Sequence, residues 1–264
     1  IMREYARITG SVPLWIGDDR TRVEEAADLC RDTGAKVCIT AIPWSGWTDP
    51  EDVGWSEDRE MEDLRYNLKR IDGTLALRNV RAEMIVFDCE MFNFRGKSDA
   101  WKEAARLKYN LAYTCAKDVF PGATVEWFCR GEKRPNGWEQ PFFSLDETGD
   151  AFSFAAYRTA EPAYWRGVMK STILHASEHG VTRVHAWVAL GSGWFNKPGQ
   201  DETWVSSMNY PLERSWQIGS EMNDPSSDVM AIFYWPRPFD PTVPEWSRHF
   251  IQYVRGATGE AFHE

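Results

Sequence analysis

The stretch EMIVFDCE, residues 83–90, places an apolar run of strand length directly before two carboxylates. Helical patterns flank it, at residues 57–77 on one side and residues 98–118 on the other. Strands that alternate with helices form parallel sheets, and such strands are apolar along their length because helices cover the sheet. This stretch therefore predicts an α/β protein built on a parallel sheet.

The same alternation extends in both directions along the chain. Strands are predicted at residues 11–16, 36–42, 83–87, 124–129, 152–157, 184–190 and 229–235, and further helices at residues 21–33, 162–179, 212–221 and 244–255. Long segments follow these strands, whereas the connections from helix to strand are short, and barrel active sites have this asymmetry. Gly17-Asp18-Asp19 follows the first strand, where a nucleotide-binding sheet would carry a glycine-rich phosphate loop. We therefore expect a (β/α)8 TIM-type barrel in preference to an open doubly wound sheet.

The pattern contains seven strands, one fewer than a complete barrel. Three alternatives account for the eighth strand: it precedes residue 1, it is an irregular strand at residues 4–8, or the barrel is incomplete. The chain has 264 residues, of which 43% are hydrophobic, and it contains no low-complexity linker and no clear repeat. We expect one catalytic barrel domain over residues 1–264.

The charge balance bears on the partners. There are 40 Asp and Glu residues against 30 Lys and Arg residues, a formal net charge of −10. Nucleic acids and anionic membranes attract basic surfaces, so neither is expected as a partner. No apolar run is long enough to cross a membrane, and no signal peptide is visible. We expect a monomer whose location is left open, with a secreted or extracytoplasmic protein slightly favoured.

The five cysteines lack metal-ligand spacing and fall mostly in predicted helices and strands. We interpret the cysteines as buried, unreactive thiols, and the alternative is that two of them form a disulfide. Neither a cofactor nor a metal is expected.

Asp88 and Glu90 stand two residues apart at a strand end, so both side chains point to the same side and Cys89 points to the other. Two carboxylates this close do not both ionise freely, and the pKa of at least one should rise. A carboxylic acid that is protonated near neutral pH is what a glycosidase uses to protonate the leaving oxygen. The alternative is an ordinary charged strand end bound to Arg95 or Lys97.

An apolar strand ending in Asp-x-Glu resembles the fourth strand of the chitinase-like glycoside hydrolases, and it is similar to strand ends of endo-N-acetylglucosaminidases and hyaluronidases. The resemblance implies that Glu90 is the general acid and that Asp88 orients an acetamido group of the substrate. It also implies that Tyr157 matches the tyrosine of the family's sixth strand. Trp235 would match the tryptophan that forms the floor of the family's sugar-binding site. The fuller chitinase motif has further aspartates upstream, where this chain has Met84 and Ile85.

Glu126 lies within the apolar strand TVEWF, residues 124–128. A buried carboxylate is costly unless it is paired or used. Glu126 is therefore a candidate nucleophile in a two-carboxylate retaining mechanism, in which the carboxyl groups stand roughly 5 Å apart. The alternative is a structural pair with an arginine.

Tryptophan is the outlier of the composition, with 14 residues, ten of them at or after the C-terminal ends of predicted strands. Aromatic rings offer flat apolar faces on which the C–H faces of sugars stack. Core filling alone does not explain so many tryptophans at one end of a barrel. The residues expected to bind the substrate are Trp44, Trp127, Trp187, Trp194, Trp235 and Asp18.

These features together predict a glycoside hydrolase that cleaves an oligosaccharide or polysaccharide. Glu90 is its expected acid/base, Asp88 its partner, and Tyr157 steadies the reacting centre. Two other classes stay open: a carbohydrate-binding barrel without catalysis, and a barrel lyase or metal-dependent hydrolase that acts on a smaller molecule.

Overall fold

The computed structural model describes residues 3, 6–7, 10–41, 57–88, 98–130, 150–156, 174, 183–189 and 227–232. This part of the chain contains one parallel sheet with three long helices, α2 (Arg20–Thr33), α3 (Glu57–Ala76) and α4 (Asp99–Val119). The strands are β1 (Ser11–Trp15), β2 (Lys36–Ala41), β3 (Ala82–Asp88), β4 (Thr124–Arg130), β5 (Ala151–Ala156), β6 (Val184–Ala189) and β7 (Ser227–Ile232).

The sequence predicts these elements closely. The three helices and six of the strands are confirmed to within one residue at each end. The last strand is the exception, because β7 begins at Ser227 and ends at Ile232, whereas residues 229–235 were expected. The predicted helices at residues 162–179, 212–221 and 244–255 fall largely outside the described residues.

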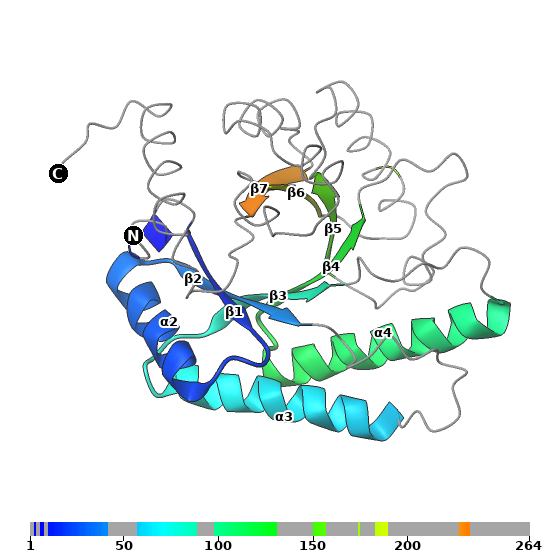
Figure 1. Cartoon of the computed structure of the whole chain (residues 1–264), viewed down its shortest axis with the longest axis horizontal. Helices are drawn as coiled ribbons and strands as arrows, with labels where there is room; N and C mark the ends of the chain where they lie inside the picture. Colours follow the sequence, from blue (N-terminus) through cyan, green and yellow to red (C-terminus); the bar gives the residue numbers. More distant parts are fainter. Residues whose placement is uncertain are drawn as a thin grey trace, which may run out of the picture.

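The strands follow one another in the sheet in the order β1-β2-β3-β4-β5-β6-β7, and each neighbouring pair is parallel. A doubly wound sheet reverses its strand order at a switch point. The described strands show no reversal, so the sheet winds in one direction. Figure 1 shows the strands arranged along a curve, with α2, α3 and α4 on the same side of β1–β4. Helices on one side of a curved parallel sheet are also a feature of α/β barrels.

The strands are also staggered along the sheet. The row of register partners that contains Asp88, the last residue of β3, continues through Phe128 and Ser153 to His185 and Asp228. The last two are the second residues of β6 and β7. The row therefore runs from the C-terminal end of β3 to the N-terminal ends of β6 and β7. A sheet that curls into a barrel requires such a stagger.

The alternative of an irregular strand at residues 4–8 does not agree with the structure. Arg3, Ala6 and Arg7 are helical, and the Gly10 N–H donates a hydrogen bond of 2.9 Å to the Ala6 carbonyl. Gly10 has a φ of +66°, the left-handed conformation that commonly ends a helix. The described residues before β1 therefore supply no eighth strand.

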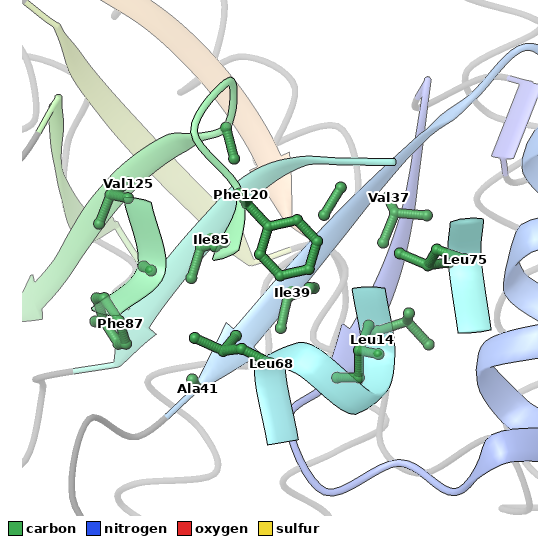
Figure 2. Packing of buried hydrophobic residues seen from close by; sticks show 14 of the residues in the cluster. Leu14, Val37, Ile39, Ala41, Leu68, Leu75, Ile85, Phe87, Phe120 and Val125 are labelled. Carbon is green, nitrogen blue, oxygen red and sulfur yellow. The ribbon is translucent and has the colours of Figure 1, made fainter. Parts of the chain in front are cut away.

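The core lies between the sheet and the helices. The α2 helix begins after Asp19, whose Oδ1 accepts a hydrogen bond of 2.8 Å from the Arg22 N–H, and it ends before Gly34, whose φ is +74°. Buried residues recur at three- and four-residue intervals in α2 and α3, so each helix turns one apolar stripe to the sheet. Figure 2 shows the stripe of α3 against the strands, and its buried members are Leu64, Leu68, Ile71 and Leu75.

Asp150, directly before β5, ties this strand to β4 and α4. Its Oδ1 accepts from the Tyr113 hydroxyl at 2.9 Å, and its Oδ2 accepts from Lys117 Nζ at 2.8 Å and from the Val125 N–H at 2.9 Å. Burial on its own would raise the pKa of Asp150, but the bonds from Lys117, Val125 and Tyr113 outweigh it and hold the pKa below its ordinary value.

We expect Asp150→Asn to lower the free energy of unfolding by about 1–3 kcal/mol at pH 7, because the charge-assisted bonds are weakened. A carboxyl whose pKa is lowered by folding stabilises the protein above its unfolded pKa and loses that contribution as the pH falls through its folded pKa. In urea unfolding, the gap between wild type and variant should therefore narrow from pH 7 to pH 3. The exposed Asp118→Asn is the control. A gap that is the same at both pH values contradicts this account.

Candidate active site

The two faces of the sheet carry different residues. Ile39 and Phe87 belong to the core cluster that includes residues of α2, α3 and α4. Their strand neighbours Cys38 and Val86 form a separate buried cluster with Phe128. Successive side chains of a strand point to opposite faces, so this second cluster marks the face turned away from the helices. We call it the inner face.

Asp88 is the last residue of β3, which ends one residue later than the sequence predicted. It follows the helix-facing Phe87 and pairs in register with Phe128, which places it on the inner face. Its side chain is half-buried. Parallel strands bring their C-terminal ends to one edge of the sheet, and in α/β barrels this edge carries the catalytic groups. Glu90 lies outside the described residues, so its pairing with Asp88 stays a prediction.

Glu126 lies on the same face but deeper. It pairs in register with Val86, two residues before Asp88 along β3, and its side chain is fully buried. Strand geometry then puts the Cα atoms of Asp88 and Glu126 roughly 8 Å apart. Burial, and to a lesser degree the charge of Glu126, raises the pKa of the Cys38 thiol. Cys38 on β2 and Glu126 on β4 therefore both lie buried on the inner face, on either side of β3.

Trp127 does not belong to this face. It is 1% exposed, its ring stacks on Phe87 at 4.8 Å between centroids, and it meets the ring of Tyr109 in α4 edge-on at 4.6 Å. Glu126 and Trp127 are neighbours on one strand, so they point to opposite faces. The expectation that Trp127 binds the substrate is therefore corrected to a packing role between the sheet and α4. The alternation of side-chain direction along β4 is the sequence signal that distinguishes the inner-face Glu126 from the helix-facing Trp127.

Asp18 lies in the turn after β1, where it is half-buried. Its Oδ2 accepts a hydrogen bond of 2.8 Å from the Trp15 N–H, and its own N–H donates to the Trp15 carbonyl at 3.0 Å. Burial raises the pKa of Asp18, and the bond from Trp15 offsets part of this shift. The described contacts give Asp18 a role in fixing the turn, and its contact with a substrate stays a prediction.

Trp15 is a strand-end residue that the sequence analysis did not select for the site. It is one of the ten strand-end tryptophans, yet it was not among the expected substrate-binding residues. It follows the buried, helix-facing Leu14 and pairs in register with Thr40, so it lies on the inner face. Its side chain is 44% exposed. Because side chains alternate in direction along β1, Leu14 faces the helices and Trp15 faces away from them.

The other predicted site residues are not tested. Tyr157 directly follows β5, and Trp235 comes three residues after the end of β7 instead of ending that strand as expected. Trp187 belongs to β6, where its register partners are Ala155 and Met230. The residues that lie outside the described part of the chain are Glu90, Tyr157, Trp44, Trp194 and Trp235.

The described residues contain no group of three His, Cys, Asp or Glu side chains placed to hold a metal ion. Cys30, Cys38 and Cys115 are buried free thiols, as expected, and burial raises the pKa of Cys30 to about 12. No helix in the described ranges combines the length and the hydropathy of a membrane span.

Several solved sugar enzymes have a similar fold. Xylanase 10B from Thermotoga maritima is 13% identical, with 88% of this chain and 76% of that chain covered and a TM-score of 0.54. A putative α-L-fucosidase from Bacteroides thetaiotaomicron is 10% identical, with 96% and 85% covered and a TM-score of 0.57. A D-psicose 3-epimerase, solved in the presence of D-fructose, is 9% identical, with 96% and 91% covered and a TM-score of 0.50.

At these identities the likeness is one of fold, and it shows distant structural similarity to TIM-barrel sugar enzymes without indicating a particular family. No protein-family model and no curated protein matches the chain significantly.

We expect Trp127→Ala to lower the free energy of unfolding by about 3–5 kcal/mol, because it empties a large buried volume between β4 and α4. Trp127→Phe should cost less, since it keeps a ring against Phe87. Urea unfolding measures both variants. A Trp127→Ala protein that is as stable as wild type but binds sugar poorly would instead place this side chain in the substrate site.

Proposed function

We propose that this chain is a glycoside hydrolase that acts on an oligosaccharide or polysaccharide, with Glu90 as general acid/base and Asp88 as its partner. The observation that carries the proposal is the position of Asp88, a half-buried carboxylate at the C-terminal end of a parallel strand, on the inner face. Similar folds in a xylanase and a putative α-L-fucosidase support a carbohydrate substrate.

In this proposal Asp88 and Glu90 divide the work. The charge of an ionised Asp88 keeps Glu90 protonated, so that Glu90 donates a proton to the leaving oxygen and later accepts one from water. Tyr157, directly after β5, steadies the reacting centre. Further sugar rings stack on a set of aromatic side chains, Trp44, Trp187, Trp194 and Trp235.

We further propose that the nucleophile is the substrate's own 2-acetamido oxygen and that Asp88 accepts a hydrogen bond from the acetamido N–H. Glu126 is the alternative nucleophile. Glu126 is fully buried and pairs with Val86, two residues before Asp88, which counts against direct contact with a sugar carbon. Substrate assistance requires an N-acetyl group beside the cleaved bond, whereas a carboxylate nucleophile does not.

The first test is Glu90→Gln, measured as reducing ends released from a panel of glycans. Gln has almost the same size but supplies no acidic proton, and general acid–base catalysis contributes typically 10²- to 10⁴-fold, so we expect a rate loss of about this size. Glu62→Gln, on the exposed surface of α3, is the matched control and should keep the wild-type rate. A Glu90→Gln protein that retains a tenth of the rate contradicts the assignment.

The second test separates the two nucleophiles. Incubation with a 2-deoxy-2-fluoro glycoside of the cleaved sugar, followed by intact mass measurement, should give no adduct, because substrate assistance forms no covalent glycosyl-enzyme. A thiazoline mimic of the cyclised intermediate should inhibit. A stable adduct mapped to Glu126 overturns substrate assistance and establishes the two-carboxylate mechanism.

A sugar epimerase is the second candidate, favoured by the fold similarity to D-psicose 3-epimerase. The same panel distinguishes it when ketohexoses are included. An epimerase converts a monosaccharide to its isomer, seen by NMR, and releases no reducing ends from a polymer. Binding of glycans without either reaction would instead indicate a carbohydrate-binding barrel.

A further inference from the structure

An exposed indole stands at the C-terminal end of β1. Trp15 is 44% exposed, and strand alternation puts it on the inner face, the same face as Asp88. Among the side chains that the structure describes, it is the large exposed apolar one that belongs to a strand. The others lie in helices or in the turn after α3, and they are Tyr66, Leu77, Leu107, Leu111 and Leu174.

Hydrogen bonds fix the backbone that carries this ring. The Asp18 carboxylate accepts from the Trp15 N–H, and the Asp18 N–H donates to the Trp15 carbonyl. The next residue, Ile16, donates to the Thr40 carbonyl at 2.9 Å and accepts from Arg70 Nη2 at 3.1 Å. The turn is thereby tied to β2 and to α3. A ring that is exposed on a fixed backbone loses little conformational entropy when it binds a ligand.

The register sets the separation between Trp15 and Asp88. Trp15 pairs with Thr40, Thr40 pairs with Val86, and Asp88 lies two residues beyond Val86. Two strand spacings and two residues along the strand correspond to roughly 12 Å between the Cα atoms of Trp15 and Asp88. A ligand ring on Trp15 therefore lies beside the reacting centre and does not occupy it.

We propose that the Trp15 indole is a stacking platform for a pyranose ring of the substrate at a distance from the cleaved bond, and that Asp18 is its positioning residue. The indole offers a flat apolar face to the C–H face of the sugar. Thr40, the partly buried neighbour of Trp15 on the inner face, adds a hydroxyl beside it. This inference rests on the proposed carbohydrate activity and adds a subsite for longer substrates.

Calorimetry in the Glu90→Gln background tests the platform, with N-acetylchitohexaose, xylohexaose and cellohexaose and their disaccharides as probes. For the hexasaccharide that binds, we expect Trp15→Ala to raise the Kd at least about tenfold, a loss typical of an aromatic contact, and to leave the Kd of the matching disaccharide nearly unchanged. Trp15→Phe keeps a ring and should recover most of the affinity. Tyr66→Ala, an exposed aromatic on α3, is the control and should change neither Kd.

Asp18 is tested through the same readout. Asp18→Ala removes the acceptor for the Trp15 N–H and should weaken hexasaccharide binding, whereas Asp18→Asn keeps an acceptor oxygen and should restore it. A merely structural role would lower the melting temperature of Asp18→Ala without changing the ratio of hexasaccharide to disaccharide affinity.

The outcomes separate this inference from the proposed function. Equal hexasaccharide affinities with and without the Trp15 ring overturn the platform and leave the hydrolase proposal intact. Equal losses on the hexasaccharide and the disaccharide overturn the remote placement. A parent protein that binds none of these sugars contradicts the proposed function and the platform together.

Discussion

The burial of one set of alternate strand residues against α2, α3 and α4 is the constraint on which the rest of the structure depends. Leu14, Ile39, Phe87 and Trp127 reach the helices from four consecutive strands. Each fully buried side chain of this kind contributes about 1.5–3 kcal/mol relative to exposure. A shift of one residue in the register of any strand would turn polar groups into this core, so the register is strongly specified.

The same constraint decides what lies on the inner face. Once Phe87 is buried against the helices, Asp88 must point the other way, and once Trp127 is buried, Glu126 must do so too. The catalytic candidates are thus positioned by the apolar residues beside them. Because all neighbouring strands are parallel, their C-terminal ends lie at one edge of the sheet, the edge that carries the catalytic groups in α/β barrels.

Much of the fold could be predicted because parallel strands are apolar runs and the helices carry a regular apolar stripe. The preference for a barrel over a doubly wound sheet rested on the long segments after the strands and on the residues after the first strand, Gly17-Asp18-Asp19, which form no glycine-rich phosphate loop. The bounds of the last strand were predicted too late, because the apolar run there extends past Ile232. The network around Asp150 was not predictable, since its partners Tyr113, Lys117 and Val125 are distant in sequence and become neighbours only when β5 pairs with β4.

The sequence predicted the carboxylate of the candidate site better than its aromatic residues, because the role of an aromatic residue depends on which side of the sheet it faces. A carboxylate at a strand end is visible in a short window of sequence, and Asp88 is where that window placed it. Tryptophans are ambiguous because the same ring serves a core and a sugar site equally well. Their roles separate only when the side of each strand is known: Trp127 faces α4, whereas Trp15 faces away from the helices.

Buried and exposed parts of the inner face suggest how the proposed site divides its tasks. Glu126 and Cys38 are buried, Asp88 is half-buried at the C-terminal end of β3, and Trp15 is exposed at the C-terminal end of β1. Chemistry is favoured where a carboxylate is partly withdrawn from water, because its protonation is then set by its neighbours. Binding is favoured where an aromatic face is open to a sugar ring.

A crystal structure of the Glu90→Gln protein with bound N-acetylchitohexaose tests the central claim most directly. The account predicts that the sugar chain lies along the C-terminal edge of the sheet on the inner face, with an acetamido N–H within hydrogen-bond distance of the Asp88 carboxylate. A sugar bound on the helical side, or at the N-terminal edge of the strands away from Asp88, would contradict it.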